Sequence, residues 1–130
     1  MGIKRFLEWI GLKERLHASV ISIPYVREGE MWWASIGENV GWEINGKNKN
    51  FTRPVIVLKK LAKGFYFVIP VTSQLRNGTW YINFKQREKA MTACLQQARS
   101  MDYRRFYSKL GELDDEDYRK IKQGFLELYS

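Results

Sequence analysis

Short apolar runs divided by turn residues are the feature that most restricts the fold of this chain. From residue 30 to residue 95 these runs are rich in β-branched and aromatic side chains, which is typical of strands. The pattern predicts a strongly bent antiparallel sheet that forms a small barrel. The predicted strands are Met31–Ile36, Pro54–Leu58, Phe65–Val71, Trp80–Phe84 and Met91–Leu95, the last running on toward Arg99.

Turn signals separate these strands. We expect turns at Ala62–Gly64 and at Arg76–Gly78, where an Asn-Gly pair suits a β-hairpin. Residues 37–52 are rich in Gly, Asn and Lys and show little periodicity, so they predict a long, mobile loop between the first two strands.

Helical periodicity occurs only near the two ends of the sequence. Apolar residues at helical spacing predict a short amphipathic helix over residues 3–10, which can lie on a membrane or pack onto its own domain; packing is the favoured interpretation. Asp114–Asp117 precede an apolar stripe from Tyr118 to Tyr129, and acidic residues stabilise a helix N-terminus. The sequence therefore predicts a mainly β, α+β fold, with an N-terminal helical extension over residues 1–28 and a barrel with a C-terminal helix over residues 29–130.

Length and charge limit the function. With 130 residues, of which 45% are hydrophobic, the chain can form one core but not two. There are 22 Lys and Arg against 14 Asp and Glu, a net charge of +8, and acidic residues concentrate in Glu112–Asp117. A basic middle region attracts polyanions. The partner can be a nucleic acid, an anionic membrane or an acidic protein segment.

Cysteine and histidine are too few for several kinds of chemistry. Cys94 alone forms no internal disulfide, and His17 alone builds no His-rich zinc site. Because Cys94 lies in an apolar run, it is expected to be a buried hydrophobic residue. We find no secretory signal and no apolar stretch of the ~20 residues that a membrane helix needs, so a cytoplasmic protein without a membrane partner is expected.

Arg53 is an unexpected residue at the entrance to the second apolar run, and Thr72–Gln74 follow the third. If these runs are antiparallel neighbours, the start of one lies beside the end of the other, so Arg53 and Thr72 meet at one edge. A guanidinium and a hydroxyl placed there can bind phosphate oxygens. Alternatively, Arg53 pairs with a carboxylate such as Glu43 and Thr72 only caps a turn.

Aromatic side chains accompany the basic residues of this region. Trp32 and Trp33 are adjacent in one strand, so alternation turns one of them outward. Exposed aromatic faces next to lysines suit single-stranded nucleic acid, whereas outward tryptophans also form homodimer interfaces; both interpretations stay open. The aromatic residues are Trp32, Trp33, Trp42, Phe51, Trp80 and Tyr81, and the lysines are Lys47, Lys49, Lys59, Lys60 and Lys63.

Four motifs in a fixed order carry a family resemblance: GEMWWASI, TRPVIVL after a Gly-rich loop, VIPVTSQ, and LQQARSMDYRRF before a terminal helix. Over residues 29–129 the chain resembles the MazF/PemK toxins of bacterial toxin–antitoxin systems. The resemblance implies an SH3-like barrel that acts as a homodimeric, sequence-selective endoribonuclease of single-stranded RNA and is inhibited by a cognate antitoxin. It assigns catalysis to Arg53 and Thr72 and implies cleavage by the ribose 2′-hydroxyl without metal or cofactor.

The chain departs from part of the family at Gln96, where some members carry an acidic residue proposed to transfer protons. An amide is no general base, so the base stays unassigned, with Glu38 and Glu43 as candidates. Residues 42–50 are expected to influence which bases are read. The expected RNA-binding residues are Trp42, Glu43, Lys47, Lys49, Ser73, Gln74, Gln96 and Gln97.

Two other functions compete with RNA cleavage. A non-catalytic RNA- or protein-binding barrel would use Arg53 only to hold a phosphate or a carboxylate. Gyrase inhibition of the CcdB kind ranks lower, because the CcdB toxins use a Trp-bearing C-terminus and this chain ends in FLELYS.

Overall fold

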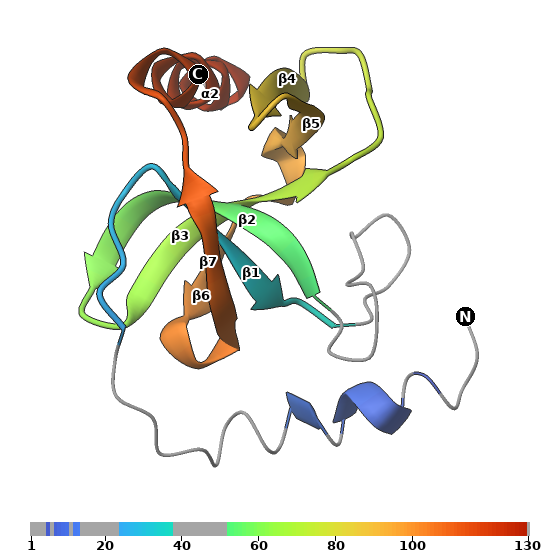
Figure 1. Ribbon diagram of the computed structural model, residues 1–130, viewed down its shortest axis with the longest axis vertical. Coiled ribbons are helices and arrows are strands. Elements are labelled where there is room, and N and C mark those ends of the chain that lie inside the picture. Colours follow the sequence, from blue (N-terminus) through green and yellow to red (C-terminus); the bar gives the residue numbers. More distant parts are fainter. Residues whose placement is uncertain (1–4, 6, 11, 14–23, 38–51, 130) are drawn as a thin grey trace.

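The computed structural model describes residues 5, 7–10, 12–13, 24–37 and 52–129. In this part of the chain seven strands form one antiparallel sheet, and a helix follows at the C-terminal end (Figure 1). Most of the loop predicted over residues 37–52 lies outside the described residues. None of the described helices is both long and apolar enough to cross a membrane.

Strands β1 (Glu30–Ser35), β2 (Thr52–Ala62) and β3 (Phe65–Thr72) are consecutive antiparallel neighbours, which confirms the first three predicted strands. The predicted turn before β3 is also confirmed, and Gly64 adopts a positive φ of 82° there. β2 extends beyond its predicted end because its pairing with β3 continues through Lys60 and Ala62. The side chains at this end of β2 are exposed, so the apolar pattern stops before the strand does.

Strands β4 (Tyr81–Gln86) and β5 (Lys89–Cys94) form a hairpin. The hairpin predicted at Asn77-Gly78 is wrong, because β3 pairs with β5 and not with β4. The true hairpin turn places Arg87 and Glu88 at positive φ, 50° and 68°. Type I′ turns need positive φ at both central residues and usually use Asn or Gly, so this turn has no sequence signal.

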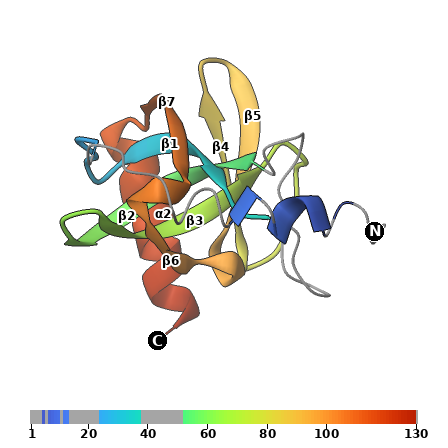
Figure 2. The same cartoon turned by 90° about the horizontal axis from the view of Figure 1, so that it is seen from below.

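The chain after β5 does not continue as the single strand that the sequence predicts. The 3₁₀ turn η1 (Leu95–Gln97) precedes β6 (Arg99–Asp102), and a second 3₁₀ turn, η2 (Tyr103–Arg105), precedes β7 (Phe106–Glu112). β6 pairs with β3 and β7 pairs with β1, so this segment joins the two sides of the β1–β2–β3 meander (Figure 2). The sequence does not predict β7 because its side chains are largely exposed and lack apolar alternation.

Two clusters of buried side chains form the core. One lies beneath the C-terminal helix and includes Ile56, Leu58 and Ile121, while the other surrounds Tyr66. Val55 and Val57 of β2 belong to the second cluster, so alternate residues of this strand are buried on opposite faces. Burial on both faces explains why the run is apolar without interruption.

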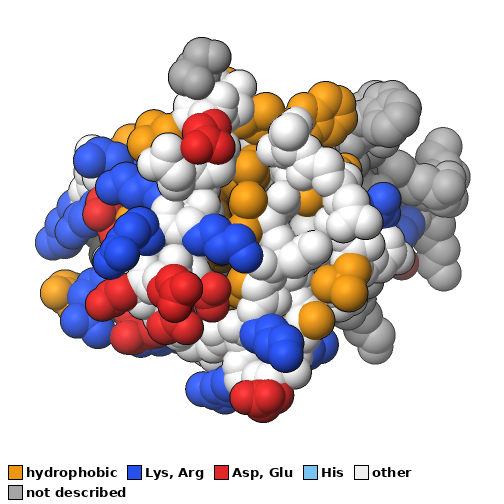
Figure 3. All heavy atoms as spheres, turned by 90° about the horizontal axis from the view of Figure 1, so that it is seen from above, with side chains coloured by type: hydrophobic (Ala, Val, Ile, Leu, Met, Phe, Trp, Pro, Cys, Tyr) orange, Lys and Arg blue, Asp and Glu red, His pale blue; other side chains and the backbone are white. Residues whose placement is uncertain are grey.

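The predicted C-terminal helix is confirmed: α2 (Asp115–Leu128) begins within the acidic cluster, with Asp114 at its N-cap and the other three acidic residues in its first turn. The Asp114 carboxylate accepts a hydrogen bond from the Asp117 amide at 2.7 Å, which caps the helix. The Tyr118 hydroxyl donates to the Leu58 carbonyl at 2.8 Å and ties α2 to β2. The face that carries α2 shows charged side chains of both signs and several exposed apolar ones (Figure 3).

A buried carboxylate joins β1 to β7. Glu30 binds Lys109 Nζ at 2.9 Å and also accepts from the Arg27 amide at 2.9 Å and from Trp32 Nε1 at 3.0 Å. Burial alone would raise the pKa of Glu30, but these three donors hold the pKa below its ordinary value. Lys109 also contacts Glu112 at 2.9 Å, so its charge is shared between two carboxylates.

The N-terminal helical segment lies at the opposite end of the molecule from α2 (Figure 1). Residues 5, 7–10, 12 and 13 are helical, so the helix extends beyond its predicted end at residue 10.

Candidate active site

Arg53 is the second residue of β2 and lies opposite Ala34 of β1. Its side chain is half-buried. Burial lowers the pKa of the guanidinium, the Cys94 thiol opposes this change, and the positive charge of Arg76 adds to it. Residues from β5 and from the loop after β3 therefore lie within electrostatic reach of Arg53.

Thr72 is the last residue of β3 and is buried, with 6% of its surface exposed. The β2–β3 register places Val55 opposite Pro70, and two further steps along the same antiparallel register lead to Arg53 and Thr72. At this point β3 pairs with β5, and Thr72 lies opposite Thr92. The backbone thus leads both predicted catalytic residues to the same region of the sheet.

The loop after β3 begins with Ser73 and Gln74, both exposed. The Gln74 amide donates to Thr72 Oγ1 at 3.2 Å, while Gln74 Oε1 accepts from Arg76 Nη2 at 2.8 Å. Thr72 therefore caps the turn, and its hydroxyl proton can still be donated to another acceptor. The Gln74–Arg76 contact places a second guanidinium beside the end of β3.

The β4–β5 hairpin has one apolar and one polar face. Alternate residues of β5 belong to the core beneath α2, so Thr92 and Cys94 face the other way. Asn83 lies opposite Thr92, whose hydroxyl donates to the Asn83 side chain, and Tyr81 lies opposite Cys94. Because Thr72 is also opposite Thr92, this polar face continues to the end of β3.

Gln96 and Gln97 are the last two residues of the η1 turn that follows β5, and both are half-buried. Gln96 Nε2 donates to the Tyr81 hydroxyl at 3.1 Å. Within the described part of the chain, Gln96 Oε1 is buried and has no hydrogen-bond partner. An unsatisfied buried acceptor costs about 1–3 kcal/mol, so a ligand that donates a hydrogen bond to it would be favoured.

The sequence analysis groups Tyr81 with the aromatic residues of this region, but it does not identify Arg76, Asn83 and Thr92, which border the site. Their positions depend on the pairing of β5 with both β3 and β4. The Asn-Gly signal points to a different pairing, and no residue pattern shows the correct one. The cross-strand register supplies the missing information.

Several predicted RNA-binding residues cannot be placed in this site. Trp42, Glu43, Lys47 and Lys49 lie outside the described residues, as does the alternative base Glu38, so their roles stay predictions. In the part of the chain that the structure describes, no group of three or more His, Cys, Asp and Glu side chains could hold a metal ion.

Three of the lysines that the sequence groups with the site are far from it. Lys59 and Lys60 lie in the second half of β2, and Lys63 lies in the following turn. An extended strand rises about 3.3 Å per residue, so residues 53 and 60 are roughly 23 Å apart. The Lys60 amide donates to Glu28 at 2.9 Å, also away from Arg53. These lysines therefore lie away from Arg53, and a contribution of their charge to RNA binding elsewhere on the surface stays a prediction.

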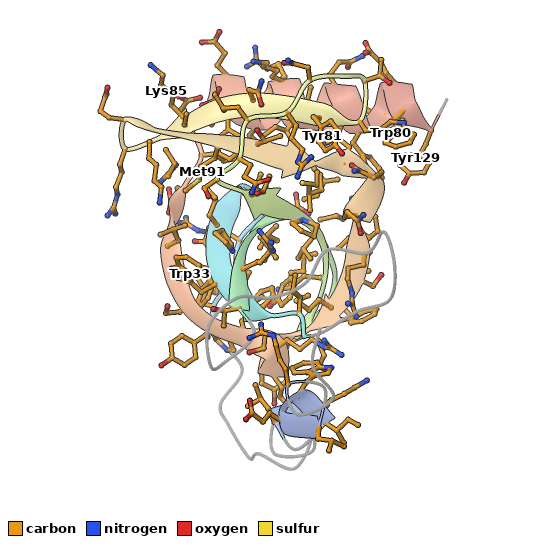
Figure 4. The ribbon with its side chains drawn as sticks, turned by 90° about the vertical axis from the view of Figure 1, so that its right-hand side faces the viewer. Trp33, Trp80, Tyr81, Lys85, Met91 and Tyr129 are labelled. Atoms are coloured by element: carbon orange, nitrogen blue, oxygen red, sulfur yellow. The ribbon has the colours of Figure 1, made fainter. Side chains whose placement is uncertain are left out.

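The tryptophans of β1 are both half-buried. Trp32 stacks on Phe106, with ring centroids 5.6 Å apart, and packs against the cluster around Tyr66. Trp33, the next residue of the strand, belongs to the other face (Figure 4). Trp80 is 51% exposed, the most exposed tryptophan among the described residues.

The fold and this site define a class of protein: a small α+β domain in which a strand-entry arginine and a strand-end threonine lie beside the polar face of a hairpin. Residues 27–129 match the family described as PemK-like, MazF-like toxin of type II toxin–antitoxin systems. The chain belongs to this family, which confirms the resemblance seen in the sequence.

Solved structures share the fold. The MazF of Deinococcus radiodurans (Form I) is 22% identical, with a TM-score of 0.68 over 82% of this chain and 98% of that one. An endoribonuclease in complex with its cognate antitoxin, from a mycobacterial species, is 10% identical, with a TM-score of 0.64 over 81% of this chain and 95% of that one. A MazE–MazF complex of D. radiodurans (Form II) gives 19% identity and a TM-score of 0.62, covering 82% of this chain and 98% of that one. None of the curated proteins matches the chain.

Proposed function

We propose that this chain is the toxin of a toxin–antitoxin pair and acts in the cytoplasm as a sequence-selective endoribonuclease of single-stranded RNA. The observation that carries the proposal is the half-buried Arg53 at the entrance to β2, in the register that leads to Thr72 and next to the polar hairpin face. Family membership supports the same function.

The proposed reaction uses the substrate's own nucleophile. The ribose 2′-oxygen attacks the adjacent phosphorus, its proton passes to a base, and the bond from phosphorus to the 5′-oxygen breaks. The products are a 2′,3′-cyclic phosphate and a 5′-hydroxyl, whose oxygen takes up a proton. Arg53, which stays protonated, stabilises the negative charge on the phosphorane oxygens, and the Thr72 hydroxyl donates a further hydrogen bond to them.

The base is not assigned by this proposal. Gln96 cannot take a proton, and its side chain is engaged with Tyr81. We propose that Ser73, Gln74, Gln96 and Gln97 contact the RNA around the scissile phosphate. Ser73 and Gln74 directly follow Thr72, and Gln96 and Gln97 follow β5, the strand that pairs with the end of β3.

We further propose an SH3-like barrel that dimerises. The pairing of β6 with β3 and of β7 with β1 supports barrel closure. The exposed Trp80, Leu126 and Tyr129 support an apolar interface between two copies; Trp80 and Tyr129 both lie at the α2 end of the molecule (Figure 4). The net charge of +8 supports inhibition by an acidic antitoxin segment that covers Arg53.

Cleavage of single-stranded RNA in EDTA tests the proposal. The wild-type chain should produce 5′-hydroxyl ends, and Arg53→Ala should lower the rate by about 10²- to 10³-fold, the usual cost of losing one preorganised donor. Arg119→Ala removes an exposed arginine of α2 and serves as the matched control. RNA binding without cleavage by the wild-type chain would favour the alternative, a non-catalytic binding barrel.

A further inference from the structure

Trp9 is buried although the segment that carries it precedes the residues matched by the family. Only 6% of its surface is exposed, whereas Leu7 and Ile10 of the same helical segment are 60% and 41% exposed. The helical segment lies directly below the ring of strands (Figure 4). Among the described residues 5, 7–10, 12 and 13 of this segment, Trp9 is the only buried one.

Gly37 accepts this ring against its backbone. The glycine lies two residues beyond the end of β1 and has a φ of 80°, in the left-handed region. A Cβ atom at this position would overlap with the indole of Trp9. Two independent constraints, the backbone conformation and the ring, thus require glycine at this position.

Arg105 holds the indole from another side. Its guanidinium carbon lies 5.6 Å from the centroid of the Trp9 ring, within the range of a cation–π interaction. Its Nη1 donates to the carbonyl of Ser35, the last residue of β1, at 3.3 Å. The indole and the guanidinium together fasten the segment between Ser35 and Gly37.

The end of β1 that is fastened in this way is the ladder partner of the site strand. Ser35 lies opposite Thr52, and Ala34 lies opposite Arg53. Since β2 begins at Thr52, Arg53 has only one preceding strand residue to hold it in place. The position of Arg53 therefore depends on a rigid end of β1.

We infer that Trp9 is a positioning residue for Arg53, which it serves by fixing the end of β1 through Gly37 and Arg105. The inference rests on the proposed function of Arg53 for its catalytic consequence, but the mechanical coupling does not. A displacement of about 1 Å in a positioned catalytic group can cost roughly 100-fold in rate, so a distant anchor can control activity.

The test compares Trp9→Ala, Trp9→Phe and the control Leu7→Ala in the full-length chain. Steady-state cleavage of single-stranded RNA gives kcat and KM, and amide hydrogen exchange reports on residues 33–37 and 52–55. For Trp9→Ala we expect kcat to fall by about 10- to 100-fold with KM nearly unchanged. Exchange should become faster at both strand ends while the β4–β5 hairpin keeps its protection.

Trp9→Phe retains an aromatic face for Arg105 and should restore kcat to within about threefold of wild type. Leu7→Ala should leave both measurements unchanged because Leu7 is exposed. Unchanged exchange at residues 33–37 and 52–55 in Trp9→Ala would overturn the inference, whether or not the protein cleaves RNA. If exchange at these residues is faster in Trp9→Ala than in wild type but the wild-type protein does not cleave RNA, only the proposed function is contradicted.

If Trp9→Ala is unfolded, hydrogen exchange in Arg105→Gln decides instead. Arg105→Gln removes the cation and keeps an amide that can donate to Ser35. Amide exchange that is faster than in wild type only at the two strand ends supports the inference. Exchange that is equally faster over the whole sheet, or unchanged at the strand ends, contradicts it.

Discussion

Thr72 and Thr92 lie directly opposite each other at the place where β3 pairs with β5. Both are buried, with 6% and 0% of their surfaces exposed. Their hydroxyls nevertheless have different partners, since Thr72 accepts from the Gln74 amide and Thr92 donates to Asn83. The pair thus allows a catalytic hydroxyl to be separated from a structural one.

Replacing each threonine with valine should give different results. Thr72→Val removes the proposed donor to the phosphorane, and we expect kcat for RNA cleavage to fall by about 10²-fold or more. Thr92→Val loses one hydrogen bond and should lower the free energy of unfolding by about 1 kcal/mol while cleavage persists. Cleavage rates and urea unfolding of both variants test whether Thr72 is catalytic and Thr92 structural. An equal loss of activity in the two variants would argue against a catalytic role specific to Thr72.

Tyr81→Phe should destabilise the fold. The change removes the hydroxyl that accepts from Gln96 Nε2 and leaves both polar atoms of that amide without a protein partner. We expect a loss of about 1–3 kcal/mol in urea unfolding. Tyr107→Phe is the matched control, since Tyr107 is 68% exposed. A Tyr81→Phe protein as stable as wild type would show that the contact with Gln96 contributes little.

Acid should weaken the link between β1 and β7. The pKa of Glu30 is lower in the fold than in the unfolded chain, so ionised Glu30 stabilises the fold fully above about pH 5. This contribution is lost as the pH falls through the lowered pKa. Glu30→Gln should be less stable than wild type by about 1–3 kcal/mol at neutral pH, and the difference should shrink in acid.

Urea unfolding as a function of pH measures this difference. Glu116→Gln, in the exposed first turn of α2, controls for the loss of a negative charge. A difference between Glu30→Gln and wild type that stays constant with pH would contradict the assignment to Glu30.

Cys94 should resist alkylation in the folded protein. The thiol is buried, 4% exposed, and burial raises its pKa although Arg53 and Arg76 oppose the change. Because reaction requires opening of the site, iodoacetamide should label folded Cys94 at least about 100-fold more slowly than the urea-unfolded chain. Mass spectrometry gives both rates; rapid labelling of the folded chain would show that Cys94 is accessible from the site.

A strand can be located in the sequence when its side chains are buried on one face or on both faces, because burial leaves a recognisable apolar pattern. The run at Val55–Leu58 is buried on both faces and β3 is apolar along most of its length, so both patterns are plain. β7 is not predictable in this way because its side chains are mostly exposed and its pairing with β1 joins residues far apart in the chain. The turn at Arg87 and Glu88 gives no signal either, because neither residue type favours positive φ.

The candidate site was predictable only in part. Arg53 and Thr72 are visible because a cation and a hydroxyl stand at the ends of apolar runs, and antiparallel pairing of two strands joined by a short turn is the usual arrangement. The sequence analysis names Tyr81 only as one of six aromatic residues and Arg76 only as a turn residue, because their approach to the site follows from a strand order in which β5 lies between β3 and β4. Charge alone does not say where Lys59 and Lys60 lie relative to Arg53, since a basic sequence region need not be a basic surface patch.

The crossing segment that joins β6 to β7 has a consequence for synthesis of the chain on the ribosome. β1 and β2 can pair early, but β3 obtains β6 and β1 obtains β7 only after residues 99–112 have emerged. Such distant pairings form slowly, and until they form both strands expose free backbone edges. A nascent chain that stalls before residue 99 therefore exposes two unpaired strand edges to other proteins, and both edges are covered only after residue 112 has emerged.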